Sequence, residues 1–600
     1  MGPISRPDDV DLAARVHKLE QMLQAQQSAQ PTDYAETTRP LTSSSTVQAN
    51  SQGRSTANIV DWDATLHLDE EGASPALHRT PSSMPFGESA KNQNLLLALP
   101  SVAACSTLVG TYFRSFASLF HILHDPTFHE QYASFTEDPD SMPLAWLALL
   151  YAVLATASLA LSTESDLLAD FSRKKSASGR ILELSQRYRD MSMKCLEADH
   201  YLWNHNVTTL QALIILVYGI GHSHGPTWTL LGLAHHMAIG IGCHVDPSIL
   251  NLGRIESEER RRCWAGLMML YTNQNAVLGH VGLPHTALHA NSQPPADVDD
   301  DELLEGPLNI QPARGKATQM TYLLLKFRLY DICAEICNGF LSHPDPPIDT
   351  LRRLDFALQE EQHSWDQRYM RDTESAPLPV HHLAHLNVLH SYGNHLVLLL
   401  HHQHALRARS DGFRTEWSRQ RCFVSAKRIL EVHSNLNTTQ ELAAFRWYGR
   451  GLGSFHAFHA AVILVSLISG NMGDQDRAQG LEALSACALR FEDMKDLSTT
   501  SAQAAPILRT LISRLSWAPQ TGSSKAHQFS NSEPASRADH LLTPEEHRDS
   551  GPIQQQWNGD FQLDDEDWIA LMDQVAPQQW LTPSSIPWDH WQSSLMAVSG

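Results

Sequence analysis

Apolar residues recur every three to four positions through most of the chain from residue 96 to residue 515, which is the spacing of one face of an α-helix. No stretch alternates apolar and polar residues over the length of a strand, so the pattern predicts an all-α fold with one large multi-helix domain. After a first helix and turn near residues 112–128, we expect helices over 144–161, 179–203, 207–219, 318–342, 349–370, 379–409, 416–436, 439–470 and 476–497.

Two polar regions flank this domain. Residues 26–95 and 516–555 are rich in Gln, Ser, Thr and Pro and contain few large apolar residues. Such segments bury too little apolar surface to offset the entropy of ordering, so we predict disordered linkers. The chain then divides into a short disordered start (1–9), a helix (10–25), a linker (26–95), the helical domain (96–515), a second linker (516–555) and a C-terminal segment (556–600).

The apolar run 144–161 is long enough to raise the question of a membrane span. It is rich in alanine, contains Thr156 and Ser158, and has no basic flank. We therefore interpret it as a buried core helix and expect no membrane association.

The helix predicted over 10–25 carries Leu12, Val16, Leu19 and Leu23, which alternate by four and three positions. This is the a/d seam of a coiled coil, but it is only about two heptads long. The spacing alone leaves two interpretations open: a dimerising zipper, or an amphipathic helix that docks on its own domain.

The stretch 228–284 is the most informative part of the chain, because it predicts two helices joined by a turn. In the first helix, Gly232 is small enough to let a neighbouring helix come close. Gly242 is a plausible stop for this helix, and the Asp246–Pro247 pair opens the turn. Ser257 is the expected N-cap of the second helix. The expected buried residues of the pair are Leu231, Ala234, Ala238, Ile241, Trp264, Leu267, Met268 and Tyr271.

The details of this pair resemble the fungal-specific transcription factor domain, the all-helical middle region of the fungal zinc-cluster regulators. The opening over 112–128 and the acidic segment 294–307, which we expect to be a loop, are also similar to that family. Ala265 and Asn273 depart from it, since the family usually has Trp and Asp at those places. The resemblance implies a structural role for Trp228, Gly232, Asp246, Pro247, Glu259, Arg260, Arg261, Arg262, Trp264, Gly282 and Pro284.

The arginine run 260–262 could be read as a phosphate clamp or an import signal. Three consecutive helical residues point about 100° apart, however, so they cannot all face one ligand. We expect at least one of them to pair with the preceding acidic residues or with a neighbouring helix.

The formal net charge of −22 argues against a chain that binds nucleic acid along its whole length. Residues 1–9 leave no room for six cysteines, and the surrounding positions are more acidic than basic. We therefore expect this chain to reach DNA only indirectly, through a partner or through a zinc cluster that it does not contain. The eight cysteines form no C-x-x-C pair, and Cys333 and Cys337 are expected in the core.

The C-terminal segment interleaves acidic residues with large apolar ones, the pattern of an acidic activation segment. Acidic residues keep such side chains solvated until a partner groove buries them. The alternative is a terminal helix that packs on its own core through Trp568 and Leu571. The side chains expected to carry activation are Trp557, Phe561, Leu563, Trp568, Ile569, Leu571 and Met572.

The 33 histidines suggest a metal site, and His381 and His385 lie one helical turn apart, as zinc ligands can. No Glu stands between them as in H-E-x-x-H, and their surroundings are rich in leucine, so we interpret them as core or interfacial histidines. The same holds for His456 and His459. Glycines 449, 451 and 453 form a turn that follows no strand, which argues against a dinucleotide site. We predict no catalytic residue, metal or cofactor.

These observations predict a nuclear regulator of transcription in a fungus, and the family resemblance implies control of a metabolic or biosynthetic gene set, secondary metabolism included. Expected partners are the transcription machinery or co-activators, and a homodimer or a heterodimer with a zinc-cluster factor. Two alternatives stay open: a non-activating co-regulator or effector-sensing partner of a zinc-cluster factor, and, more distantly, a helical metalloenzyme built on the histidines of 381–409.

Overall fold

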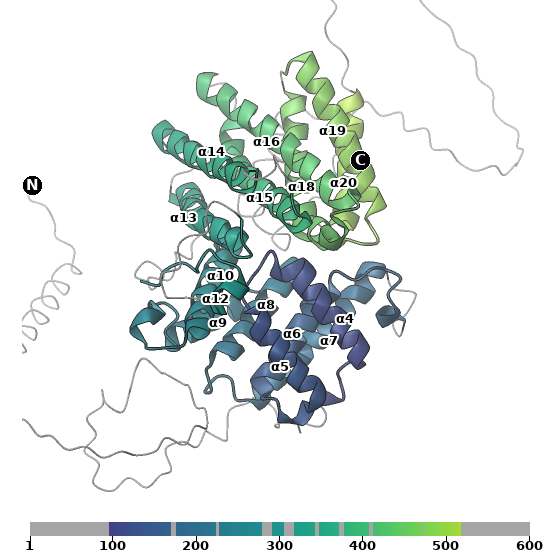
Figure 1. The fold of residues 1–600 in the computed structure, drawn as a ribbon. Helices are drawn as coiled ribbons and strands as arrows, with labels where there is room; N and C mark the ends of the chain where they lie inside the picture. The colour runs from purple at the N-terminus through teal and green to yellow at the C-terminus, as the bar shows by residue number, and fades with distance from the viewer. Residues whose placement is uncertain are drawn as a thin grey trace, which may run out of the picture. The chain divides into compact units, whose positions relative to one another are not determined.

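Every regular element in the described part of the chain is a helix, which confirms the all-α prediction (Figure 1). All described residues belong to one unit, Thr56–Gly600. The computed structural model describes residues 95–169, 176–223, 227–278, 291–304, 317–342, 347–370, 377–406, 412–470 and 472–517.

The helices form two groups in chain order, which we call the first and second helical groups. The first contains α4 (Val102–Tyr112), the π-helical turn η1 (Phe113–Ala117), α5 (Asp125–Glu137), η2 (Pro139–Ser141), α6 (Leu144–Ser158), η3 (Asp166–Leu168), α7 (Ala177–Ala198), α8 (Val207–His222), α9 (Trp228–Gly240), η4 (Pro247–Ile249), α10 (Arg254–Leu278) and α12 (Asp300–Leu304). The second contains α13 (Thr321–Ser342), α14 (Ile348–Met370), α15 (Val380–Leu406), α16 (Gly412–Thr438), η5 (Ala443–Phe445), α17 (Arg446–Tyr448), the π-helical turn η6 (Gly449–Gly453), α18 (Ser454–Ser469), α19 (Asp474–Asp493) and α20 (Thr499–Trp517).

Helix α6 is the core of the first group. All of its residues after Leu144 are buried, and it packs against α7 and α8. The approach of α8 is close, because a Cβ added at Gly219 would lie 2.7 Å from Oγ1 of Thr156. Burial on all sides by other helices is what the sequence predicted for this apolar run.

The predicted helix pair is present as α9 and α10, with the predicted stop between them. Gly242 has φ = 83°, a left-handed conformation that favours glycine. Its N–H donates to the carbonyl oxygen of Ile239, and that of Cys243 donates to Ala238, which together form a Schellman motif. Asp246 then caps the 3₁₀ turn η4 through a bond from the N–H of Ser248 (3.0 Å).

Two details predicted for this pair are wrong. Helix α10 begins at Arg254, and Ser257 lies inside its first turn, with its N–H bonded to the carbonyl oxygen of Gly253. No described residue lies within 4 Å of a Cβ built at Gly232, so no helix of the described part of the chain approaches it closely. The close approach is at Gly266 on α10, where a Cβ would lie 2.4 Å from Cδ1 of Ile122.

Helix α18 is the core of the second group, with every residue from Ser454 to Ile468 buried. The segment Ala443–Ser469 is long and apolar enough to cross a membrane, but 94% of its most apolar window is buried inside the protein, as in a core helix. The single helix predicted over 439–470 is wrong. The chain is broken at Gly451 (φ −93°, ψ −113°), where a Cβ would lie 3.0 Å from the carbonyl oxygen of His222.

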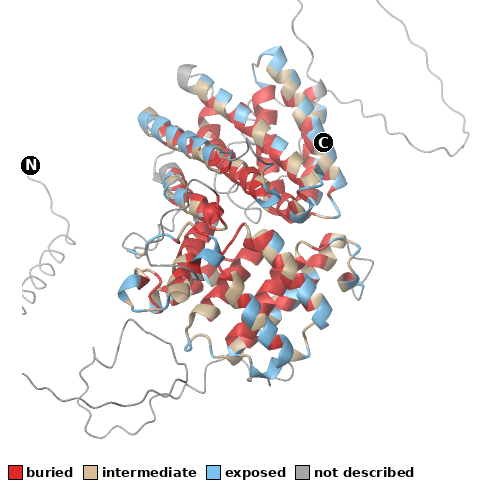
Figure 2. Cartoon of the chain, viewed as in Figure 1, coloured by how far each residue is buried: buried red, intermediate tan, exposed pale blue. Residues whose placement is uncertain are grey.

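Other boundaries also differ from prediction. The helix expected over 179–203 ends at Ala198, since His200 takes a positive φ of 53°. The acidic segment expected as a loop contains the short helix α12, and α20 was not predicted separately. Cys333 and Cys337 are buried in the core, as predicted. Figure 2 shows buried residues on the inward faces of the helices and exposed residues on the outward faces.

Candidate functional site

The three arginines at the start of α10 point to three different places. Arg261 donates to the carboxylate of Asp246 in the turn after α9 (3.0 Å). Arg260 bonds Glu256 (2.9 Å) and also the backbone carbonyl oxygen of Ile241 at the end of α9. The expectation that at least one of these arginines pairs with an acid is therefore confirmed.

Arg262 is fully buried and is held by two carboxylates. Its Nη2 donates to Oδ1 of Asp300 at 2.6 Å, and its Nε donates to Glu258 at 3.3 Å. Its Nη1 donates to the carbonyl oxygen of Leu123 at 3.0 Å. This side chain thus joins α10 to the turn before α5 and to α12, three segments far apart in sequence.

The acidic segment 293–300, which we call the acidic clasp, connects the two helical groups. Its backbone is held by α10, because the N–H of Ala296 donates to Glu258 (3.1 Å). Asp297 accepts hydrogen bonds from the hydroxyls of Thr318 (2.6 Å) and Thr321 (3.0 Å) at the start of α13, and it pairs with Arg368 on α14. The clasp is therefore a structural connection and not a solvated loop.

Asp300 is the most connected residue of the clasp. Its Oδ2 accepts from the N–H of Asp125 (2.7 Å) and from Nε2 of His121 (3.1 Å). Burial alone raises the pKa of Asp300, but the hydrogen bond from His121 and the charge of Arg262 outweigh it, so its pKa lies well below the usual range. Asp300 is therefore an ionised carboxylate with donors on both oxygens.

His121, Asp125 and Asp300 offer one ligand atom each, all within 4.8 Å of one another, and could in principle hold a metal ion. Two facts oppose this use. Both oxygens of Asp300 already accept protein hydrogen bonds, and the guanidinium of Arg262 lies 2.6 Å from one of them. A dication here would meet that fixed positive charge, so the arrangement suits a structural network.

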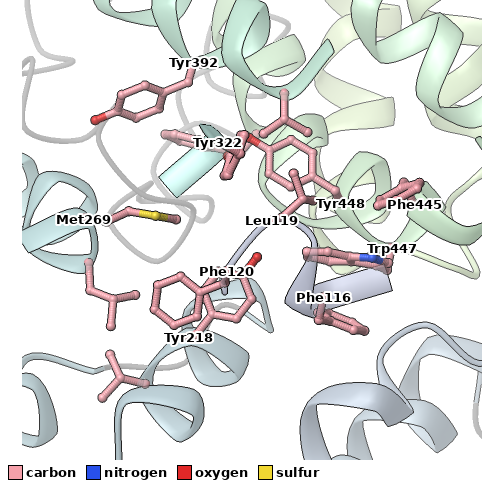
Figure 3. Close-up of a cluster of buried hydrophobic side chains, with 14 of the residues drawn as sticks. Phe116, Leu119, Phe120, Tyr218, Met269, Tyr322, Tyr392, Phe445, Trp447 and Tyr448 are labelled. Atoms are coloured by element: carbon pink, nitrogen blue, oxygen red, sulfur yellow. The ribbon is translucent and has the colours of Figure 1, made fainter. Parts of the chain in front are cut away.

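An aromatic cluster forms the second contact between the helical groups (Figure 3). Phe116 of η1 stacks on Trp447 of α17 with ring centroids 4.1 Å apart, and Phe120 stacks on Tyr218 of α8 at 4.2 Å. His222 at the end of α8 meets the edge of Trp447 at 4.8 Å. Such pairs contribute about 0.5–1.5 kcal/mol each beyond burial, so this contact stabilises one arrangement of the two groups.

Lys326 on α13 lies beside this cluster and is 3% exposed. Its ammonium stands over the ring of Tyr392 on α15, 2.9 Å from the centroid. No carboxylate of the described residues lies within ion-pair distance of it. Burial lowers the pKa of Lys326 to about 7, and the nearby thiol of Cys333 opposes that shift only in part.

Two buried histidines, His395 and His456, lie in the same interior as Lys326. Nδ1 of His456 on α18 lies 2.9 Å from the hydroxyl of Ser391, and its ring stacks on His395 with centroids 4.3 Å apart. Burial, together with the charges of His395 and Lys326, holds the pKa of His456 well below its ordinary value. His456 therefore stays neutral at pH 7.

Three of the four histidines singled out in the sequence, His385, His456 and His459, are core side chains, as predicted, whereas His381 is exposed. His385, His456 and His459 are buried, and the rings of His381 and His385 lie 5.8 Å apart. Tyr369 Oη lies 3.0 Å from Nδ1 of His385. His385 is thus part of a hydrogen-bonded interior between α14 and α15, and His381 lies beside it at the surface.

The other predicted signature residues are spread along the two helices. Trp228 meets Tyr271 edge-on at 6.2 Å, and Trp264 packs beside His235 with ring centroids at 5.6 Å. Pro247 is buried, and Glu259 accepts a bond from Gln211 (3.0 Å). Gly282, Pro284, the predicted pairing residues in 10–25 and the predicted activation residues in 556–600 lie outside the described residues.

Sequence reasoning missed Asp300, His121 and Lys326. A separate signal existed for the first two, because an isolated His–x–x–His–Asp motif and an acidic run both stand out. For Lys326 the signal was a lysine that directly follows the apolar residues 322–325.

Comparison with known proteins supports the family resemblance. Residues 109–337 match the family model of the fungal specific transcription factor domain. That region of the chain is similar to a fungal specific transcription factor domain. The match covers η1, the α9–α10 pair, the acidic clasp and Lys326, and it confirms the resemblance seen in the sequence.

The curated relatives of this chain are named as transcription regulators or transcription factors. The chain is 26% identical over 383 residues to an uncharacterized transcriptional regulatory protein, C139.03, of Schizosaccharomyces pombe, covering 62% of this chain and 56% of that protein. It is 24% identical to the equisetin cluster transcription factor eqxF of Fusarium heterosporum (50% and 44% covered). It is 26% identical to the Zn(2)-C6 fungal-type transcription factor pigI of Monascus ruber (54% and 40% covered). The chain thus aligns with about half the length of these relatives.

Proposed function

We propose that this chain is a nuclear regulator of fungal transcription that controls a metabolic or biosynthetic gene set. The match of residues 109–337 to the fungal transcription factor domain carries this proposal. The relative eqxF, which is named as a cluster transcription factor, supports the choice of gene set. A family of transcription regulators also speaks against an enzyme, and the buried, hydrogen-bonded histidines give the metalloenzyme alternative no support.

Within this proposal the described helical body is a regulatory domain, and the undescribed ends make contacts with other proteins. Residues 10–25 would mediate pairing with a second copy or with a zinc-cluster factor. DNA would be reached through that partner or through a zinc cluster. Residues 556–600 would recruit co-activators or the transcription machinery through aromatic side chains flanked by acids.

A tethering experiment tests this function. The full chain is fused to a DNA-binding domain of known site specificity and placed upstream of a reporter gene. We expect activation that is lost when the chain is cut after residue 555, and lost in the double variant Trp568→Ala, Leu571→Ala. The matched control is Trp580→Ala, which changes a tail tryptophan without adjacent acids.

A fluorescent fusion of the full chain should concentrate in the nucleus. Reporter output that is equal with and without residues 556–600 would remove the activator function. Exclusion of the fusion from the nucleus would contradict the proposal as a whole.

A further inference from the structure

The buried cations of the described residues differ in one respect. Three Lys or Arg side chains are buried there: Arg260, Arg262 and Lys326. Both arginines pair with carboxylates, at 2.9 Å and 2.6 Å respectively. Lys326 has no carboxylate partner within the described part of the chain. A buried cation normally needs an anionic partner, and the thiol of Cys333 on the same helix offsets the burial of Lys326 only in part.

The surroundings of Lys326 fit an organic anion. Tyr392 provides an aromatic face directly below the ammonium. His456 and His395 bring two further imidazoles to the same interior. Tyr322, one turn before Lys326 on α13, belongs with Met269 and Tyr392 to the apolar cluster of Figure 3. One positive charge next to an aromatic side chain matches one negative charge on an otherwise apolar molecule.

We propose that Lys326 is the anion-binding residue of an internal site for a small apolar carboxylic acid, placed where the second helical group meets the first. A carboxylate fits better than a phosphate, because a single ammonium balances one negative charge and a phosphate brings nearly two. The inference rests on the proposed regulatory function and adds to it a small molecule that acts as the effector. It adds the chemical class of the effector and the residue that recognises it.

The position of the site offers a route from binding to regulation. Besides burial, the charges of Lys326 and of His222, at the end of α8, both lower the pKa of His456. His222 in turn contacts Trp447 in the aromatic cluster. An anion at Lys326 would therefore change the electrostatic field at the contact between the two helical groups.

Binding should depend on pH in a defined direction. The titratable groups around Lys326 are Cys333 on its own helix, Tyr392 on α15 and His456 on α18. The pKa of Lys326 is about 7 when no anion is bound, so the lysine is mostly neutral above that pH. A carboxylate that binds there requires the lysine to take up a proton at the same time. The affinity should then fall by about tenfold for each pH unit above 7.

The test uses the purified full chain and straight-chain carboxylates from acetate to decanoate together with benzoate, each at up to 10 mM. The neutral amide of each acid is its matched control. Thermal unfolding and calorimetric titration are carried out at pH 6.5 and 8.5. We expect at least one carboxylate to raise Tm and to bind at least tenfold more weakly at pH 8.5, while its amide has no effect.

Variants assign the effect to the lysine. Lys326→Met should abolish the carboxylate-dependent rise in Tm, and the exposed Lys495→Met should retain it. Equal binding of acid and amide, or carboxylate binding that survives in Lys326→Met, would overturn the proposal. So would the absence of any carboxylate effect across the panel, which would mean that the lysine needs no external anion. These binding data do not depend on the reporter, so the proposed function can stand or fall separately.

Discussion

Arg262 and Lys326 are equally inaccessible to water but have opposite surroundings. Arg262 lies in the first helical group between two carboxylates and a backbone carbonyl group. Lys326 lies in the second group over an aromatic ring, without a carboxylate partner among the described residues. A charge with all its partners holds segments together, whereas a buried charge without a counter-ion lowers stability. The difference suggests that the first cation serves the fold and the second serves binding.

The largest expected effect comes from removing the paired cation. Arg262→Met leaves Asp300 and Glu258 buried without their main partner, which should lower the free energy of unfolding by about 3–5 kcal/mol. Chemical denaturation measures it. The control Arg328→Met removes an exposed pair with Glu361 and should cost less than about 1 kcal/mol. A loss below about 1 kcal/mol for Arg262→Met would show that the network does not hold the clasp.

Removal of Lys326, the cation without a carboxylate partner among the described residues, should raise the free energy of unfolding. Since the folded pKa of Lys326 is about 7, below its ordinary value of 10.5, the unfolded chain binds one more proton between these values. Stability from this group therefore rises with pH across that window and is lowest at pH 7 and below. Lys326→Met should stabilise the protein by about 2–4 kcal/mol at pH 7.

The gain from Lys326→Met should shrink steadily as the pH is raised from 7 to 9.5. Denaturation curves of the variant and the unchanged protein at several pH values measure this trend. A variant that is destabilised at pH 7, or a gain that does not depend on pH, would break the comparison with Arg262.

A buried histidine extends the comparison to neutral groups. Burial lowers the pKa of His402 to about 4, so the folded protein keeps it neutral while the unfolded chain takes up a proton below pH 6.5. Stability should therefore fall by about 2–3 kcal/mol from this group between pH 6.5 and 4. His402→Met should remove that part of the acid dependence, and the exposed His363→Met should not. Parallel profiles for all three proteins would contradict this account.

The smallest expected effects come from alanine substitutions at two glycines on neighbouring helices. A Cβ at Gly266 meets Ile122 at 2.4 Å, so Gly266→Ala should cost about 1–3 kcal/mol through overpacking. A Cβ at Gly232 meets nothing, so Gly232→Ala should stabilise α9 by up to about 1 kcal/mol through helix propensity. Thermal unfolding of the two variants gives the order, and the reverse order would show that the helix contact runs through Gly232.

These glycines also show how far the sequence could predict the structure. Apolar periodicity was sufficient for α6, α8 and the α9–α10 pair, because burial of a continuous face is a local property of the pattern. It could not tell which glycine would face another helix, since Gly232 and Gly266 have similar sequence neighbourhoods and only packing distinguishes them. The break at Gly451 likewise depends on the carbonyl group of His222, more than two hundred residues earlier.

The candidate site was predicted in part. The divergence of three consecutive arginines follows from helix geometry, so the sequence indicated that they pair separately. Their partners were not predictable in the same way, because Arg262 reaches Asp300 and Leu123 only through the tertiary fold. Lys326 could not be predicted for a related reason: a lysine beside apolar residues normally extends its ammonium to water, and the packing of α13 against α10, α14 and α15 prevents this.

Direct titration of Lys326 tests the comparison most closely. Lysines labelled with carbon-13 at Cε report their own charge state by NMR, and the signal missing from Lys326→Met identifies Lys326. We expect a pKa of about 7 in the free protein and a rise of at least one unit when saturated with the carboxylate that binds best. A pKa near 10 in the free protein would mean that Lys326 already has a counter-ion and would contradict the account.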